Sequence, residues 1–192
     1  MTDSPMPRRG LVLLDRDGTI NVDCHYLDDP DRLVLCPNAG EGLRQLRGLG
    51  LGLMVITNQS AIGRGYFTVE RLGQIHDRLR ELTAACGAPL DAIYFCPHRA
   101  EDGCQCRKPL PGMFEQALRD FGPLPPNLFM IGDKASDIDF GRNIGATTLL
   151  VRTGYGSQTE AAGTASPDYV VDDLPAAAER IAQLLADEGV EN

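Results

Sequence analysis

Short apolar runs that end in polar residues recur along this chain, and they constrain its fold more than any other feature. The runs are GLVLLD, LGLMVITN, AIYFC, NLFMIGD, TTLLV and YVV, spread over residues 10–171. Apolar runs of this length are typical of strands buried on both faces of a parallel sheet. The sequence therefore predicts a mainly parallel sheet with polar residues gathered where its strands end.

Helical patterns separate these runs. Apolar residues recur three or four positions apart at 43–49, 69–82 and 113–121, and a last helix is predicted at about 175–186. Strands that alternate with helices predict a single three-layer, Rossmann-like α/β domain over residues 1–192. The stretch GYGSQTEAAGTASPD is rich in small residues and predicts a surface loop.

The overall charge restricts the partners of the chain. With 27 acidic and 18 basic residues, the net charge is -9, which opposes non-specific binding to nucleic acid or to an anionic membrane. No apolar run approaches the ~18 residues that span a bilayer, and the first ten residues lack the apolar core of an export signal. We therefore expect a cytoplasmic protein with reduced cysteines that binds neither nucleic acid nor membranes.

Asp15 and Asp17 stand directly after the first predicted strand, in the sequence DRDGTIN. Two carboxylates so close together require a cation, and Gly18 gives the backbone the freedom to turn sharply beside a bound phosphate. An isolated Asp-x-Asp-Gly sequence is more typical of a plain acidic turn. The polar residues at the other strand ends distinguish a cation and phosphate site from a plain acidic turn.

Two more strand ends carry groups that complement the aspartates. Thr57 and Asn58 follow the second run, and Asp133 and Lys134 follow the fourth. Asp15 with Asp133 can chelate Mg²⁺, whereas the hydroxyl, the amide and a lysine at position 108 or 134 can hold phosphoryl oxygens. The combination predicts a magnesium-dependent phosphate site at the carboxyl ends of the strands.

The segment CPHRAEDGCQCRKP places four metal-ligand side chains within eleven positions, namely Cys96, His98, Cys104 and Cys106. Residues two apart in an extended chain share a face, so the four form two pairs joined by a short loop. Three thiolates and one imidazole complete a tetrahedral site, which predicts a structural zinc that holds the loop 96–106. A redox switch, a zinc-ribbon nucleic-acid module and scattered core thiols fit this spacing and this acidic chain less well.

Together these motifs resemble the haloacid dehalogenase superfamily of phosphatases. The matching segments are Asp15-Arg16-Asp17-Gly18-Thr19, Thr57, Lys108, and Gly132-Asp133 through Asp137. The resemblance implies that Asp15 attacks phosphorus, that Asp17 protonates the leaving group and later activates water, and that Thr57 and Lys108 hold the phosphoryl group. It also implies Mg²⁺ ligation by Asp15, Asp133 and the carbonyl oxygen of Asp17. Asp137 either supports the metal ligands or caps the following helix.

The interval from Asp15 to Thr57 spans 42 residues, too few for a large cap domain. The site is therefore expected to be open, bordered by residues 23–30 and by the zinc loop. Within the superfamily, DRDGTIN, TNQSAIGRGYF, CQCRKPLPGM and IGDKASD look like the D-glycero-D-manno-heptose 1,7-bisphosphate phosphatases, which remove the 7-phosphate in nucleotide-heptose synthesis. The resemblance implies that Arg107 and Lys134 contact the phosphorylated sugar. The alternative for Arg107 is an ion pair with Asp102.

Further substrate contacts are predicted around the same strand ends. Gln59 and Ser60 extend the second strand tip and either reach the substrate or cap a turn. Contacts implied at Asp23, His25 and Tyr26 fall in CHYLDD, where Gly-Tyr-Val is usual in the heptose enzymes.

Two alternatives remain open at the level of sequence. Histidinol-phosphate phosphatases have similar motifs, and Asp28 or Asp29 would suit the cationic amine of their substrate. A catalytically idle zinc-binding interaction module is the alternative of another class, although the complete set of catalytic-type residues favours an enzyme. Because every motif lies in one chain, a monomer is sufficient for catalysis.

Overall fold

The computed structural model describes residues 9–188, without the side chain of the last of these, and the predicted domain limits at 1 and 192 lie outside this range. Its strands are β1 (Leu11–Leu14), β2 (Gly52–Asn58), β3 (Ala92–Cys96), β4 (Leu128–Gly132), β5 (Thr147–Val151) and β6 (Tyr169–Val171). Its helices are α1 (Ala39–Gly48), α2 (Val69–Ala85), α3 (Gly112–Phe121), α4 (Ala135–Asn143), α5 (Gly156–Ala162) and α6 (Leu174–Glu188), with short 3₁₀ turns at Pro30–Arg32 and Ala100–Asp102. Every predicted strand and helix is confirmed.

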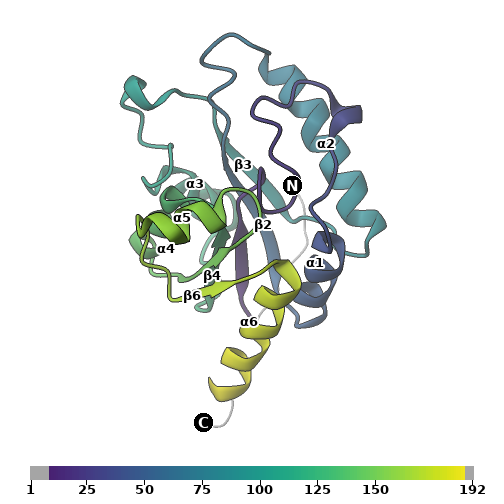
Figure 1. The fold of residues 1–192 in the computed structure, drawn as a ribbon, viewed down its shortest axis with the longest axis vertical. Coiled ribbons are helices and arrows are strands. Elements are labelled where there is room, and N and C mark those ends of the chain that lie inside the picture. Colours follow the sequence, from purple (N-terminus) through teal and green to yellow (C-terminus); the bar gives the residue numbers. More distant parts are fainter. Residues whose placement is uncertain (1–8, 189–192) are drawn as a thin grey trace.

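The strands form one parallel sheet in the order β3-β2-β1-β4-β5-β6 (Figure 1). The chain winds outward in one direction from β1 to β3 and then returns to the other side of β1 with β4. In open parallel sheets the crevice at such a reversal, at the carboxyl ends of the strands, is where ligands bind. The topology therefore brings the residues that follow β1 and β4 side by side.

Two apolar layers hold the helices against this sheet. Val12 and Leu14 of β1 pack into the layer that includes residues of α1, α2 and α6, whereas Leu11 and Leu13 pack into the layer with α3 and α4. Because successive side chains of a strand point to opposite faces, a continuous apolar run satisfies both layers at once. The molecule is thus the predicted single three-layer α/β domain, and the interval between β1 and β2 holds no large cap.

One prediction was wrong: the stretch at 154–168 is not entirely a loop, because α5 occupies Gly156–Ala162. Small residues are a weak guide to structure, which tertiary contacts override. Here the Tyr155 N–H donates to Asp133 Oδ2 at 2.8 Å, and the Thr159 hydroxyl donates to the Asp133 carbonyl at 2.9 Å. These bonds anchor the first turn of α5 to the end of β4.

In the described part of the chain, no helix combines the length and the apolar character that crossing a bilayer requires.

Candidate active site

Three carboxylates meet at the carboxyl ends of β1 and β4. Asp15, Asp133 and Asp137 are 4%, 0% and 1% exposed, and one oxygen from each lies within 4.8 Å of the others. The Asp15 N–H donates to the Ile131 carbonyl at 3.0 Å, which continues the β1–β4 pairing up to the cluster. Gly18 makes the approach possible, because a Cβ at this position would lie 2.2 Å from Asp133 Oδ2.

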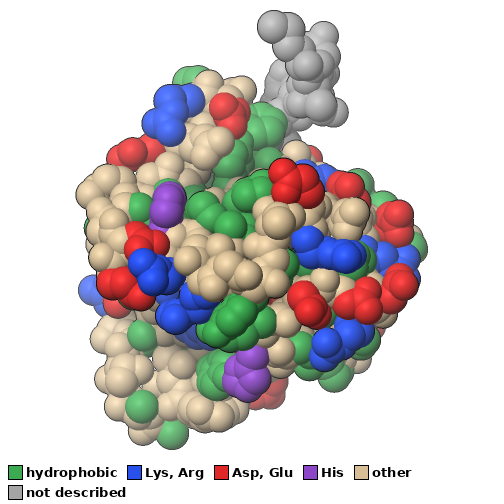
Figure 2. Space-filling view, turned by 90° about the horizontal axis from the view of Figure 1, so that it is seen from above, with side chains coloured by type: hydrophobic (Ala, Val, Ile, Leu, Met, Phe, Trp, Pro, Cys, Tyr) green, Lys and Arg blue, Asp and Glu red, His purple; other side chains and the backbone are tan. Residues whose placement is uncertain are grey.

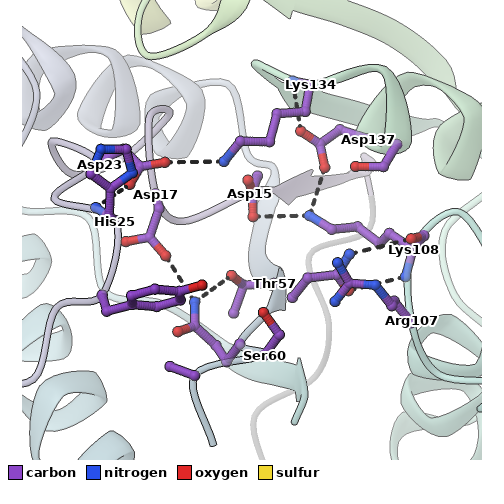
Figure 3. Close-up of a pocket in the computed structure, with 15 residues that line it drawn as sticks. Asp15, Asp17, Asp23, His25, Thr57, Ser60, Arg107, Lys108, Lys134 and Asp137 are labelled. Atoms are coloured by element: carbon purple, nitrogen blue, oxygen red, sulfur yellow. Dashed lines mark hydrogen bonds and ion pairs between the residues drawn. The ribbon is translucent and has the colours of Figure 1, made fainter. Parts of the chain in front are cut away.

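Two lysines face this cluster (Figure 3). Lys108 Nζ is buried, lies 2.9 Å from Asp15 Oδ1 and 2.8 Å from Asp137 Oδ1, and donates to the Ile56 carbonyl. Lys134 Nζ lies 3.2 Å from Asp23 Oδ2 and 3.9 Å from Asp133 Oδ1. Burial opposes the charge of both lysines, but the surrounding aspartates outweigh it and raise the pKa of each. Both ammonium groups are therefore charged at neutral pH.

The acidic cluster fits a divalent cation of the magnesium type. Asp133 Oδ1 is buried and has no hydrogen-bond partner. Burial and the negative charge of Asp15 raise the pKa of Asp133 to about 8, although the charge of Lys134 opposes this shift. Carboxylate and carbonyl oxygens are the ligands that Mg²⁺ prefers. The carboxylates of Asp15 and Asp133 thus suit this cation, and the third expected ligand, the backbone carbonyl of Asp17, stays a prediction.

Asp137 contacts both the first turn of α4 and the buried lysine Lys108. Its Oδ2 accepts the Lys134 N–H at 3.0 Å, as an acid in the first turn of α4 should, while its Oδ1 lies beside Lys108. A Cβ at Gly132 would lie 2.4 Å from Asp137 Oδ2, so the close approach depends on that glycine. Asp137 therefore caps α4 and holds Lys108 in front of Asp15.

Asp17 lies on the other side of Asp15 and accepts hydrogen bonds at both carboxylate oxygens. The donors are Arg16 at 2.7 and 2.9 Å, Asn21 at 2.9 Å and Gln59 at 2.8 Å. Burial opposes its ionisation, but the Arg16 charge and these hydrogen bonds outweigh burial and lower the pKa of Asp17. Gln59 also donates to the Thr57 hydroxyl at 2.9 Å.

A pocket of about 220 Å³ opens over these groups. The sequence-predicted residues that line it are Asp15, Asp17, Asp23, His25, Tyr26, Thr57, Asn58, Gln59, Ser60, Arg107, Lys108 and Lys134. Asp133 is not among the lining residues, but its Oδ1 lies 3.9 Å from the Nζ of the lining residue Lys134. Ala61 and Ser136 also line the pocket and were not predicted as site residues, although they lie within the matching segments TNQSAIGRGYF and IGDKASD.

The rim of the pocket is held by contacts between distant loops. Asp23 Oδ1 accepts the His25 N–H at 2.7 Å, and its other oxygen pairs with Lys134. The Tyr26 and Tyr66 rings lie 4.6 Å apart between centroids, and Lys134 lies over the Tyr155 ring at 5.2 Å. The loop that was expected to border the site therefore does so.

Asp28 and Asp29, which would suit a cationic amine, do not line the pocket. Asp28 lies 3.6 Å from Arg32, and Asp29 accepts the Asp31 N–H at the start of a 3₁₀ turn. The structure thus removes the feature that favoured a histidinol-phosphate substrate.

Arg107 reaches the pocket from the zinc loop. Its Nη1 donates to the His98 carbonyl at 3.1 Å, and Asp102 pairs instead with Arg99 at 2.9 Å. The proposed Arg107–Asp102 ion pair is therefore not formed. Asn58 accepts the Lys108 N–H at 3.0 Å, so the backbone of Lys108 is held while its side chain reaches Asp15.

Cys96, His98, Cys104 and Cys106 converge with one ligand atom each within 4.8 Å. Their sulfur atoms are 3.2–3.6 Å apart, and His98 Nδ1 is 3.3 Å from Cys106 Sγ. All three cysteines are free thiols, and tetrahedral zinc with bonds of about 2.3 Å to sulfur requires separations of this order. The donor set fits zinc.

Figure 2 shows acidic and basic side chains interspersed over the face that it presents. Within the pocket, Arg107, Lys108 and Lys134 supply local positive charge for an anionic ligand of this acidic protein. Carboxylates and lysines at the switch point of a parallel sheet, without a large cap, define a hydrolase of the haloacid dehalogenase-like class.

Comparisons with known proteins agree with this class. A family model described as HAD-hydrolase-like matches residues 105–177. D-glycero-beta-D-manno-heptose-1,7-bisphosphate 7-phosphatase of Pseudomonas aeruginosa is 38% identical and covers 91% of this chain and 99% of its own. The D-glycero-D-manno-heptose-1,7-bisphosphate 7-phosphatase of Thermosynechococcus vestitus is also 38% identical, over 94% of this chain and 99% of its own.

A solved structure extends the similarity to three dimensions. The D,D-heptose 1,7-bisphosphate phosphatase of B. bronchiseptica, complexed with magnesium and phosphate, superposes with a TM-score of 0.84 at 35% identity, over 91% of this chain and 99% of its own. The chain therefore belongs to the heptose-bisphosphate phosphatase family of haloacid dehalogenase-like hydrolases, and it is a phosphoric monoester hydrolase.

Proposed function

We propose that the protein removes the 7-phosphate of D-glycero-D-manno-heptose 1,7-bisphosphate in a Mg²⁺-dependent reaction, during the synthesis of nucleotide-activated heptose. The observation that carries this proposal is the pocket itself, which joins a carboxylate cluster to the cations of Lys108, Lys134 and Arg107. The names of the relatives supply the sugar.

Asp15 is the proposed nucleophile. One carboxylate oxygen bonds to phosphorus, the ester bond breaks, and an aspartyl phosphate remains for water to hydrolyse. Lys108 lies 2.9 Å from Asp15 and orients the carboxylate while it offsets the charge of the incoming phosphoryl oxygens. Thr57 and Asn58, at the end of β2, bind those oxygens. Mg²⁺ held by Asp15, Asp133 and the Asp17 carbonyl would reduce the repulsion between the carboxylate and the phosphate.

Asp17 is the proposed acid and base. The Arg16 charge favours the carboxylate form, which takes a proton from the attacking water. The negative charge of a bound phosphate opposes that ionisation and would favour the protonated form, which gives its proton to the leaving sugar oxygen, so one group serves both half-reactions. Its position on the pocket wall, held by Arg16 and Gln59, supports this role.

Arg107 is the proposed selector for a second phosphate. Its planar guanidinium suits phosphate oxygens, and the described residues include no carboxylate that pairs with it. Asp23, His25, Tyr26, Gln59, Ser60 and Lys134 would contact the sugar or its phosphates from the remaining walls.

Zn²⁺ bound by the four clustered side chains would be structural, because all four positions are protein ligands. We further propose that residues 1–192 form one domain, that a monomer is sufficient, and that the protein works in the cytoplasm. Its free thiols suit a reducing compartment, and the pocket is complete within one chain.

The experiment compares Mg²⁺-dependent phosphate release from heptose 1,7-bisphosphate, heptose 7-phosphate and histidinol phosphate. The proposal expects the highest kcat/KM with the bisphosphate and no activity for Asp15→Asn. Arg107→Gln should raise KM for the bisphosphate at least tenfold more than for the monophosphate, because a lost charge-assisted bond corresponds to about 1.5–3 kcal/mol. A wild-type preference for histidinol phosphate would overturn the substrate, and full activity of Asp15→Asn would overturn the mechanism.

A further inference from the structure

Arg16 stands between the two catalytic-type aspartates, yet the mechanism above gives it no direct contact with substrate. Its side chain is only 1% exposed and is among the largest fully buried side chains of the described residues. Burying a guanidinium is unfavourable unless its charge is paired and its hydrogen bonds are made. Arg16 Nη1 is buried without a hydrogen-bond partner, so the contacts that offset the burial are those of Nε and Nη2.

Nε and Nη2 of Arg16 both contact the carboxylate of Asp17. Arg16 Nε lies 3.1 Å from Asp17 Oδ1, and Nη2 lies 2.9 Å from Oδ1 and 2.7 Å from Oδ2. A planar fork that meets both oxygens restricts rotation of the carboxylate as well as its position. A lysine at this position would supply the charge without the fork.

Gln59 completes a closed network around the same carboxylate. Arg16 Nη2 donates to Gln59 Oε1 at 3.1 Å, while Gln59 Nε2 donates to Asp17 Oδ2 at 2.8 Å and to Thr57 Oγ1 at 2.9 Å. Gln59 follows β2, whereas Asp17 follows β1, so the network joins two neighbouring strand ends. It also ties the carboxylate to a proposed phosphoryl-binding hydroxyl.

The charge of Arg16 also acts on a buried histidine of α2. His76, on this helix, is 6% exposed, and its ring packs against that of Phe95 at 5.8 Å. Burial, with the charges of Arg16 and Arg80, lowers the pKa of His76 to about 3, so the imidazole is neutral. A neutral neighbour does not compete with Arg16 for the Asp17 carboxylate.

We propose that Arg16, together with Gln59, is a positioning residue that directs proton transfer by Asp17. In the first half-reaction the bond from phosphorus to the sugar oxygen breaks, and that oxygen takes the proton of the Asp17 carboxyl group. In the second, water gives a proton to Asp17, its oxygen bonds to phosphorus, and the acyl phosphate bond to Asp15 breaks. This inference rests on the proposed function and adds that a fixed carboxylate direction is needed in both steps.

The test varies the leaving group, because a nitrophenolate departs without a proton whereas a sugar alkoxide does not. Arg16→Lys and Arg16→Gln are compared with wild type on the heptose bisphosphate and on 4-nitrophenyl phosphate, in single-turnover and steady-state experiments. In both Arg16 variants, the first step with the heptose bisphosphate should be about 100-fold slower than in wild type, which is within the usual range for general acid catalysis. The KM for the heptose bisphosphate should change less than threefold.

With 4-nitrophenyl phosphate, the first turnover of the Arg16 variants should be within fivefold of wild type. Nitrophenolate should then appear as a burst equal to the enzyme concentration, because hydrolysis of the aspartyl phosphate still needs Asp17 as the base. Asp17→Asn should show the same pattern more strongly. A general structural defect would instead slow both substrates equally and produce no burst.

Two further variants separate positioning from folding. Gln59→Leu, which keeps Arg16, should give the same leaving-group-selective loss in the rate of the first step and serves if the Arg16 variants do not fold. Loss of a sugar contact of Gln59 would appear separately, as a higher KM. Arg47→Gln is the matched control, since Arg47 forms an arginine–aspartate pair with Asp91 at 2.8 Å beside the amino-terminal end of β2. Arg47→Gln should leave unchanged the ratio of the rate with the heptose bisphosphate to the rate with 4-nitrophenyl phosphate. Equal losses on both substrates in folded Arg16 and Gln59 variants would overturn the positioning role, whereas a wild type inactive on both would overturn the proposed function itself.

Discussion

Replacing Asp133 by Asn should stabilise the metal-free protein while it abolishes catalysis. Asp133 Oδ2 accepts the Tyr155 N–H at 2.8 Å, and Oδ1 is buried without a partner near the carboxylates of Asp15 and Asp137. An asparagine keeps one oxygen for Tyr155 and turns an NH₂ group towards those carboxylates. Because asparagine is neutral at every pH, the buried cluster loses one negative charge without having to bind a proton.

The magnitude follows from the raised pKa of Asp133. Burial and Asp15 raise this pKa from 3.8 to about 8, so the folded protein binds a proton at neutral pH that the unfolded chain releases. The contribution of Asp133 to the free energy of unfolding is fully present below pH 3.8. It is lost as the pH rises towards 8, at about 1.4 kcal/mol per pH unit. At pH 7 this loss of unfolding free energy is at most about 4 kcal/mol. A lower bound of about 1 kcal/mol follows from the usual cost of burying a polar group without a partner. Asp133→Asn should recover about 2 kcal/mol.

Urea unfolding in EDTA at pH 7, followed by circular dichroism, measures this difference. Added Mg²⁺ should reverse the order, because wild type gains about 2.7 kcal/mol at a hundred times Kd and the variant gains much less. Asp91→Asn is the control: both oxygens of Asp91 are used, by Arg47 and by the Leu53 N–H, so this variant should lose about 1–3 kcal/mol. If Asp133→Asn is no more stable than wild type in EDTA, the reasoning about the orphaned carboxylate is wrong.

Two other regions yield further predictions. Purified protein should keep about one zinc per chain through dialysis, and Cys104→Ala should lose the metal and melt at a lower temperature, whereas Cys24→Ala, outside the cluster, should do neither; a metal-free wild type of equal stability would refute the zinc site. For His76, whose pKa is lowered from 6.5 to about 3, stability is complete above pH 6.5 and falls as the pH drops below it. Between pH 6.5 and 5 this loss is about 2 kcal/mol, so the unfolding free energy of His76→Gln should depend correspondingly less on pH. Parallel pH profiles of the two proteins would contradict a buried neutral imidazole.

Most of the fold followed from local sequence patterns. A buried parallel strand must be apolar on both faces, and an amphipathic helix must repeat its apolar residues every three or four positions, so both leave a signature in any short window. Because carboxyl ends of parallel strands meet at one edge, the positions of Asp15, Thr57 and Asp133 after three such runs also predicted that they converge. The helix α5 left no comparable signature, since its contacts are with Asp133, more than twenty residues earlier.

The sequence by itself determined the types of catalytic and metal-binding groups and the strand ends that carry them. Only the tertiary structure decided how those groups pair. It placed Lys108 between Asp15 and Asp137, residues separated by 93 and 29 positions, and left Arg107 rather than Arg99 to face the pocket. It also turned Arg16 into the protein, onto Asp17 and Gln59. The physical reason is that ion pairs depend on distances of a few ångströms between strand ends and loops, which are set by the packing of the whole sheet and are not encoded in any local window.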